Sequence, residues 1–215
     1  MENKDLRGAF IGLNARLKAG VKELREKSEK MRLDALCVKV SVKEKAEHFA
    51  IVAGRISAFL NTPFDCSPDY YIKIHKTLFD GREDFAGRFR KHRFELSTIS
   101  PNDLPGELEN IMAAERQYIS ERPETAELIP HIAKLHAFLW GTHFFPGGNT
   151  RTSKVFIIGY LRAMGYKVNV SYFMDNHRYL KDALYSAVID GEEKYILRFY
   201  RNVLNGENNK LSFEE

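Results

Sequence analysis

Between Thr142 and Lys154 the sequence THFFPGGNTRTSK gathers a histidine, two adjacent glycines, an asparagine, an arginine and a lysine. Glycine and asparagine adopt left-handed or tight backbone conformations at little cost, so the N–H groups of such a loop can converge on an anion. The helical pattern after the loop would aim its positive N-terminal end at the same place. The segment therefore predicts a phosphate-binding loop with a histidine at its edge.

The polar residues of this loop take separate roles in that hypothesis. Arg151 and Lys154 are three residues apart, so on a first helical turn they would lie near each other and meet separate phosphate groups. Asn149 is expected to donate an amide hydrogen to a third oxygen. His143 is placed to take a proton from an attacking hydroxyl when its imidazole is neutral. The same residues also fit a glycine turn after a helix, with solvated basic side chains and no ligand.

The elements that must position this loop are mostly helical. Ser67 followed by Pro68 is typical of an N-cap and a first helical residue. Within 18–45 the pattern predicts an exposed amphipathic helix with a further short element behind it. Apolar residues recurring at steps of three and four then predict helices at 43–60, 68–79, 108–121, 127–141, 152–164 and 176–204. Only the stretch 88–95, which mixes aromatic and basic residues, favours a β-hairpin or extended flap. We expect an all-α helical bundle with one small β-hairpin.

Length and composition limit the organisation and the function classes. A chain of 215 residues can bury one substantial core, and we divide it into an N-terminal helical appendage (1–45), one main domain (46–204) and a polar tail (205–215). Lys and Arg (33) exceed Asp and Glu (29) by four, which suits a phosphate ligand but lacks the dense basic character of a nucleic-acid binder. The two cysteines have no zinc-site spacing.

The sequence also predicts where the protein is found. The first ten residues lack the apolar core of a signal peptide, and the run VFIIGYL is too short to span a bilayer. We therefore expect a soluble cytoplasmic protein with no membrane contact, or one that a dedicated secretion system exports as an effector.

The loop resembles the signature of the Fic (filamentation induced by cAMP) family, HxFx(D/E)GNGRxxR. The matching positions are His143, Phe145, Gly148, Asn149 and Arg151. The similarity extends beyond the loop, because IHKTLF and FAGRFR resemble the family's helix and AGxxR segment before its flap, and YLRAMGYKVN and YLKDALYSAV resemble its closing helices. The resemblance runs from about residue 70 to residue 204 and implies a Fic-type helical bundle.

The resemblance also implies an activity, the transfer of AMP from ATP to a hydroxyl of a target protein. In that mechanism His143 deprotonates a Ser, Thr or Tyr hydroxyl, which attacks the α-phosphate in line. Gly148, Asn149 and the Thr150 backbone form the anion hole around the α- and β-phosphates, while Arg151 holds the β-phosphate. ATP or another nucleotide is thus the expected co-substrate, with Mg²⁺ as its companion ion.

The flap has its own implied role, which is to dock the backbone of the target protein by strand addition. Phe145 is expected to pack beneath the phosphate loop and fix its shape. The N-terminal segment is expected to dock a partner such as an antitoxin or a second copy of the chain. The flap residues expected to meet the target are Arg88, Phe89, Arg90 and Phe94.

Three positions depart from the family pattern: Thr150 replaces a glycine, in a form that looks like a variant of free-standing bacterial members, and two others bear directly on the chemistry. Gly147 stands where active members carry the Asp or Glu that helps to hold Mg²⁺, so the chain has no predicted metal ligand and metal recruitment should weaken, although ATP can bring its own ion. Lys154 replaces the second arginine, which keeps the positive charge but loses the bidentate grip on the γ-phosphate. Two hypotheses follow: a weakened or altered transferase, or a catalytically inactive module that binds nucleotide or a partner.

Two further interpretations have less support in the sequence. The basic clusters RFRKHR and RFYRN would suit a nucleic-acid binder, but no recognition-helix pattern accompanies them. The family's inhibitory motif, (S/T)xxxE(G/N), has a partial match in Glu207 and Asn208, with Val203 where Ser or Thr is expected. A helix end followed by a polar tail explains these last residues better.

Overall fold

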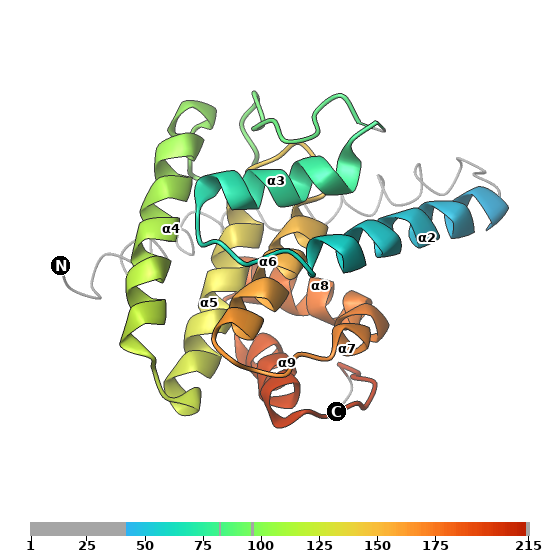
Figure 1. Ribbon diagram of the computed structural model, residues 1–215. Helices are drawn as coiled ribbons and strands as arrows, with labels where there is room; N and C mark the ends of the chain where they lie inside the picture. Colours follow the sequence, from blue (N-terminus) through green and yellow to red (C-terminus); the bar gives the residue numbers. More distant parts are fainter. Residues whose placement is uncertain (1–41, 82, 96, 214–215) are drawn as a thin grey trace.

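The computed structural model of the chain describes residues 42–81, 83–95 and 97–213, with the backbone alone for residues 42–50. These residues form a bundle of α-helices and contain no β-strand (Figure 1). The predicted all-α fold is confirmed. The appendage predicted for residues 1–45 lies almost wholly outside the described residues. Among the helices that the structure does describe, none combines the length and the apolar character needed to cross a membrane.

The first two described helices begin and end close to their predicted bounds. Helix α2 spans Val42–Phe59 and α3 spans Pro68–Phe79. The hydroxyl of Ser67 accepts a hydrogen bond from the N–H of Tyr70, and proline occupies the first helical position, so the start of α3 follows the predicted capping chemistry. A long connection then runs from α3 to the helix that begins at Leu104.

The centre of the fold is a pair of helices, α5 (Thr125–Thr142) and α6 (Asn149–Ala163), joined by the glycine-containing loop. Helix α6 is buried on nearly all sides, as its apolar run VFIIGYL requires. Helix α3 packs against α6, and α9 (Lys194–Asn205) packs against α5. Helix α4 (Leu104–Glu121) flanks α3 at one side of the bundle (Figure 1).

The C-terminal third differs from the prediction of one helix over 176–204. It contains α7 (Val170–Asp175), α8 (His177–Tyr185), a π-helical turn η2 (Ser186–Asp190) and α9. The continuous helix is therefore wrong. Gly191 gives the physical reason, because its φ of 70° is left-handed and its N–H closes the π-turn on the carbonyl of Ser186.

The predicted β-hairpin at 88–95 is not formed by the described residues of the connection between α3 and α4, which contains turns and a 3₁₀ helix η1 (Pro101–Asp103). The backbone N–H of Arg90 donates to the carbonyl of Phe144 at 2.9 Å instead of to a partner strand. The Arg90 side chain bonds the carbonyls of His92, Ile99 and His143. This connection is thus shaped by one buried arginine and held against the end of α5.

The tail predicted from residue 205 begins where α9 ends, with Gly206 at a left-handed φ of 72°. The tail is polar and mostly exposed, and the Glu207 side chain points to solvent. Leu211 is the buried member, and its N–H donates to Oδ1 of Asn176 at 2.7 Å. The tail is therefore held against the body of the fold near the start of α8.

Candidate functional site

The loop between α5 and α6 has a left-handed residue at each end. His143 caps α5 with φ 49°, and Gly148 precedes α6 with φ 74°. A left-handed backbone is uncommon for a residue other than glycine, and it marks His143 as a strained position at a helix end. Its carbonyl oxygen accepts a 2.7 Å hydrogen bond from Nε of Arg90, while its own N–H donates to the carbonyl of Trp140. The backbone of His143 is thus fixed from both sides.

Two aromatic rings hold the imidazole of His143. Phe94, from the connection between α3 and α4, stacks on it with centroids 3.8 Å apart, and Trp140 meets it edge-on at 5.3 Å. Nδ1 is buried and lacks a hydrogen-bond partner among the described residues. A reacting group would therefore approach Nε2.

Burial sets the charge of this histidine. Desolvation lowers the pKa of His143 from 6.5 to about 4, outweighing the nearby carbonyls of Trp140 and Gly141, which raise it; the positive charge of Arg90 lowers it further. The imidazole is therefore neutral at pH 7 and able to accept a proton. An anion bound beside it would raise its pKa and make it a stronger base.

Gly148 is required by its surroundings. A Cβ added at this position would lie 2.3 Å from ring atoms of Phe79, which no side chain can tolerate, and φ is left-handed as well. Arg151 and Thr152 both donate their backbone N–H groups to the carbonyl of Gly148, which starts α6 immediately after it. The loop and the N-terminal end of a 15-residue helix therefore meet at this glycine, as an anion-binding site requires.

Asn149 shapes the loop with its side chain. Its Oδ1 accepts from the N–H of Phe145 at 3.0 Å, and its Nδ2 donates to the carbonyl of the same residue at 2.8 Å. The side-chain amide predicted to bind a phosphate oxygen is thus used within the protein. What Asn149 can offer a ligand is its backbone N–H. Phe145 itself is buried and stacks on His75 with centroids 3.8 Å apart, beneath the loop.

Thr150 connects the phosphate loop to the candidate base. Its hydroxyl accepts a hydrogen bond from the indole Nε1 of Trp140 at 2.9 Å, and the same indole contacts His143. The threonine side chain therefore positions Trp140, while its backbone belongs to the first turn of α6.

The two basic residues of α6 lie in different surroundings. The guanidinium of Arg151 lies 4.6 Å from the ring centroid of Phe79 in a cation–π contact, and the charge of Glu83 acts on it. Lys154 is only 5% exposed, and its Nζ contacts the thioether of Met174 at 3.6 Å. Burial, and next the charge of Arg151, lower the pKa of Lys154 to about 8. No carboxylate pairs with Lys154 within the described part of the chain.

The four flap residues lie in four different surroundings. Arg88 is exposed, and Phe89 packs inward with its ring stacked on Phe145 at 5.9 Å. Phe94 covers His143, as described above. Arg90 is 6% exposed, and the bonds it makes inside the connection leave it as a structural residue. The structure thus brings the flap against the candidate base, but only part of it faces outward.

Sequence reasoning missed His75, which joins two loops. Its Nδ1 accepts the N–H of Gly87 at 2.8 Å, so its Nε2 carries the proton and donates to the carbonyl of Gly147 at 3.0 Å. Burial lowers the pKa of His75 to about 4, so it stays neutral. The letters IHKTLF place it on the apolar face of a helix, and that position gives no sign of its two partners.

Gly147 offers no side chain where the resemblance implied a metal-binding carboxylate. A Cβ at this position would lie 3.2 Å from Cζ of Phe85, so a side chain here would be crowded by that ring. No three or more His, Cys, Asp or Glu residues gather to hold a metal ion in the described ranges. The residues around Gly147 therefore do not fit a magnesium ion held by the protein.

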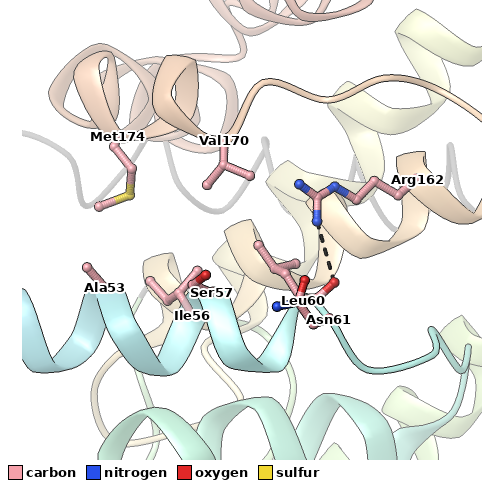
Figure 2. A pocket seen from close by; sticks show the side chains of 8 residues that line it. All are labelled: Ala53, Ile56, Ser57, Leu60, Asn61, Arg162, Val170 and Met174. Atoms are coloured by element: carbon pink, nitrogen blue, oxygen red, sulfur yellow. Dashed lines mark hydrogen bonds between the residues drawn. The ribbon is translucent and has the colours of Figure 1, made fainter.

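A separate hollow of about 170 Å³ lies between α2, α6 and α7 (Figure 2). It is smaller than the roughly 300–1,000 Å³ of typical ligand pockets. Arg162 closes one side by donating to the carbonyl of Leu60 at 3.4 Å. Met174 links this hollow to the phosphate-binding segment, because it lines the hollow and contacts Lys154. The hollow is lined by Ala53, Ile56, Ser57, Leu60, Asn61, Arg162, Val170 and Met174.

Comparison with known proteins finds one matching family model and solved structures of similar fold. Residues 65–161 match the model of the Fic/DOC family. BepC, a VirB-translocated effector from Bartonella tribocorum solved with bound AMPPNP, aligns with a TM-score of 0.64 at 17% identity, over 77% of this chain and 88% of its own. The N-terminal FIC domain of Bep8 from Bartonella sp. 1-1C aligns with a TM-score of 0.61 at 18% identity, over 77% and 87%. At these identities the likeness concerns the fold. No curated protein matches the chain significantly.

Proposed function

Because residues 65–161 of this chain match the model of the Fic/DOC family, we propose that the protein is a Fic-type transferase. It moves AMP, or a related phosphate-containing group, from a nucleotide to a Ser, Thr or Tyr hydroxyl of a target protein. The observation that carries the proposal is the neutral imidazole of His143, held by Phe94 and Trp140 beside a glycine loop that opens onto a helix N-terminus.

In the proposed reaction the acceptor hydroxyl approaches Nε2 of His143 and gives up its proton there. Its oxygen attacks the α-phosphorus, a new P–O bond forms to the target, and the bond from the α-phosphorus to the bridging oxygen breaks with release of pyrophosphate. His143 leaves this step as imidazolium and returns its proton to solvent. The negative charge of the bound phosphates raises the pKa of His143 during the reaction, which brings the base closer to the working pH.

The phosphates lie in this proposal at the N-terminal end of α6. Backbone N–H groups at Gly148, Asn149 and Thr150 surround the α- and β-phosphates, and the helix dipole favours their charge. Arg151 holds the β-phosphate, and Lys154 supplies a second cation deeper in the fold. Because no carboxylate pairs with Lys154 among the described residues, a bound phosphate would supply the anion that this buried ammonium lacks.

The target protein docks in this proposal on the outward part of the connection between α3 and α4. Arg88 is exposed there, and Phe94 lies directly on the imidazole, so a docked segment would present its hydroxyl to His143. An antitoxin or a second copy of the chain remains the predicted partner of residues 1–45. Cytoplasmic action, or export as an effector like the VirB-translocated protein of similar fold, both agree with this function.

Labelled nucleotide tests the activity. The full chain is incubated with ³²P-α-ATP and cell lysate, with Mg²⁺, Mn²⁺ or EDTA, beside a His143→Ala variant of equal folded content. We expect protein-bound label that depends on His143. Absence of such labelling with ATP, GTP, CTP and UTP would show that the chain does not transfer nucleotidyl groups.

A second function is favoured by Gly147, where the family's carboxylate is missing. In this alternative the chain binds nucleotide at the same loop without turning it over and acts as a regulatory or interaction module. Calorimetry with ATP separates the two. Binding without His143-dependent label supports the module, and binding with label supports the transferase.

A further inference from the structure

Phe85 lies against the backbone of Gly147 from the connection between α3 and α4. A Cβ at Gly147 would be 3.2 Å from its Cζ, a tight contact that requires the ring to shift by a few tenths of an ångström, and 3.6 Å from its Cε2, an ordinary van der Waals distance. A turn fixes the Phe85 backbone, because its carbonyl accepts the N–H of Arg88 at 2.9 Å. The aromatic ring therefore fills the first part of the space that a longer side chain at position 147 would need.

His75 keeps this arrangement in place. Its imidazole bonds the carbonyl of Gly147 through Nε2 and the N–H of Gly87 through Nδ1, so the phosphate loop and the segment that carries Phe85 are clamped to one ring. The centroid of Phe85 lies 6.0 Å from that imidazole. Moving the ring away from Gly147 would therefore require Phe85 to change its rotamer within a tied segment.

The charges of the site compensate for a missing cation. The positive charge of Arg151 disfavours the charged form of Lys154, and the Nζ of Lys154 contacts a thioether where a carboxylate would neutralise it. Without an acidic side chain at position 147, nothing at that position opposes a polyphosphate. Buried cations interact with a phosphate more strongly than solvated ones, because the local dielectric is low.

We propose that Phe85 takes the place of the metal-holding carboxylate, and that this site binds the phosphates of its nucleotide directly through Arg151, Lys154 and the N-terminal end of α6. No metal ion is held by the protein in this mode of binding. The inference rests on the proposed function for the identity of the ligand, and it adds how the phosphates are recognised.

Metal dependence of binding tests the inference. The Kd of AMPPNP for the full chain is measured by calorimetry in excess Mg²⁺ and in EDTA. We expect the two values to agree within threefold. A Kd that rises more than threefold in EDTA would overturn the inference, and so would the absence of AMPPNP binding in both solutions.

The result is distinguishable from a failure of the proposed function. Metal-independent binding without His143-dependent label would retain the inference and reject the transferase. Label transfer together with strongly Mg²⁺-dependent binding would retain the transferase and reject the inference.

Four variants test the role of Phe85: Phe85→Leu, Gly147→Ala, Gly147→Glu and the Phe85→Leu/Gly147→Glu pair. Gly147→Ala adds the Cβ without a charge and separates crowding from metal binding. We expect Mg²⁺ to tighten AMPPNP binding at least tenfold in the pair and less than threefold in each single variant. An equal gain in Gly147→Glu alone would show that Phe85 does not block the position. Thermal unfolding of each variant confirms that it is folded.

Discussion

Arg90 donates its Nε–H to the carbonyl oxygen of His143 over 2.7 Å, and its Nη2 reaches the carbonyl of Ile99 at the same distance. One side chain thus connects the backbone of the candidate base to the far end of the segment that covers it. The planar guanidinium makes these bonds in fixed directions, which an ammonium cannot reproduce. The shape of the acceptor side of the site therefore depends on Arg90.

Replacing Arg90 by lysine should loosen this segment while leaving the phosphate loop intact. We expect faster hydrogen exchange across residues 83–100, at least tenfold slower label transfer, and an AMPPNP Kd within threefold of the unchanged protein. Arg201→Lys is the matched control, because Arg201 is exposed on α9 and lies outside this segment. Unchanged hydrogen exchange in the Arg90 variant would contradict the role given to this residue.

The two hydrogen bonds of His75 can be tested one at a time. His75→Gln keeps a donor near the Nε2 position for Gly147, and His75→Asn keeps an acceptor near the Nδ1 position for Gly87. If holding Gly147 matters most for the phosphates, the Gln variant retains more AMPPNP affinity than the Asn variant. His75→Leu should lower the free energy of unfolding in urea by about 2 kcal/mol, because it leaves buried backbone groups unpaired.

Equal affinities of the Gln and Asn variants would mean that the Gly147 bond has no special part in binding. The Leu variant then serves as the reference for a purely structural effect, because it removes both bonds and keeps an apolar side chain.

Nucleotide binding should depend on pH through Lys154. Its pKa is lowered to about 8, so the ammonium of the free protein loses its proton as the pH rises past that value. A bound phosphate favours the charged form, so affinity falls above pH 8 and binding takes up a proton there. Calorimetry at pH 7 and 9, in two buffers of different ionisation enthalpy, measures both effects.

Lys154→Arg provides the control for this pH dependence. Arginine stays charged throughout the range, so its binding should be flat between pH 7 and 9 with no proton uptake. The same pH dependence in the Arg variant would assign the titration to another group.

Much of the fold follows from the sequence because long apolar periods specify helices. The regular patterns around α3, α5 and α6 gave their positions within a few residues. The hairpin failed because strand propensity measures how side chains fit a pleated surface, and here Arg90 ties the backbone to the end of α5. The continuous C-terminal helix failed because a single glycine, Gly191, ends a π-turn inside the pattern.

The candidate site was predicted less completely, for a different reason. The motif placed His143 and Arg151 beside the loop, where the structure also places them. It did not show that the amide of Asn149 would turn back onto Phe145, nor that His75 would bond residue 147 from 72 residues away. These partners depend on how separate helices pack, which no local pattern encodes.

Acid should destabilise the protein through its buried histidines. Burial lowers the pKa of His75 and His143 to about 4 and that of His136 to about 3, from 6.5. Below pH 6.5 the unfolded chain binds protons that the folded chain does not, so this stability is complete above pH 6.5 and is lost as the pH falls toward 4. Each histidine should lower the free energy of unfolding by up to about 1.4 kcal/mol for each pH unit of acidification.

Urea unfolding between pH 7 and 4.5 measures how the free energy of unfolding changes with pH. His136→Gln should make the free energy of unfolding less dependent on pH by one histidine's contribution, because His136 is fully buried and bonds Ser153 and Tyr200. An identical pH dependence in this variant would show that other groups account for the acid dependence.

Gly147 and Gly148 are adjacent glycines, yet different features of the structure limit which side chains each position can accept. At Gly148 the left-handed φ of 74° strains any side chain whatever the space around it, and a Cβ would also lie 2.3 Å from ring atoms of Phe79. Gly147 is restricted only by the far end of Phe85. In a saturation screen, a Phe85→Leu background should therefore widen the range of residues accepted at position 147 and leave position 148 unchanged. Tolerance at residue 147 depends on a neighbour in space, whereas at residue 148 it depends first on the backbone.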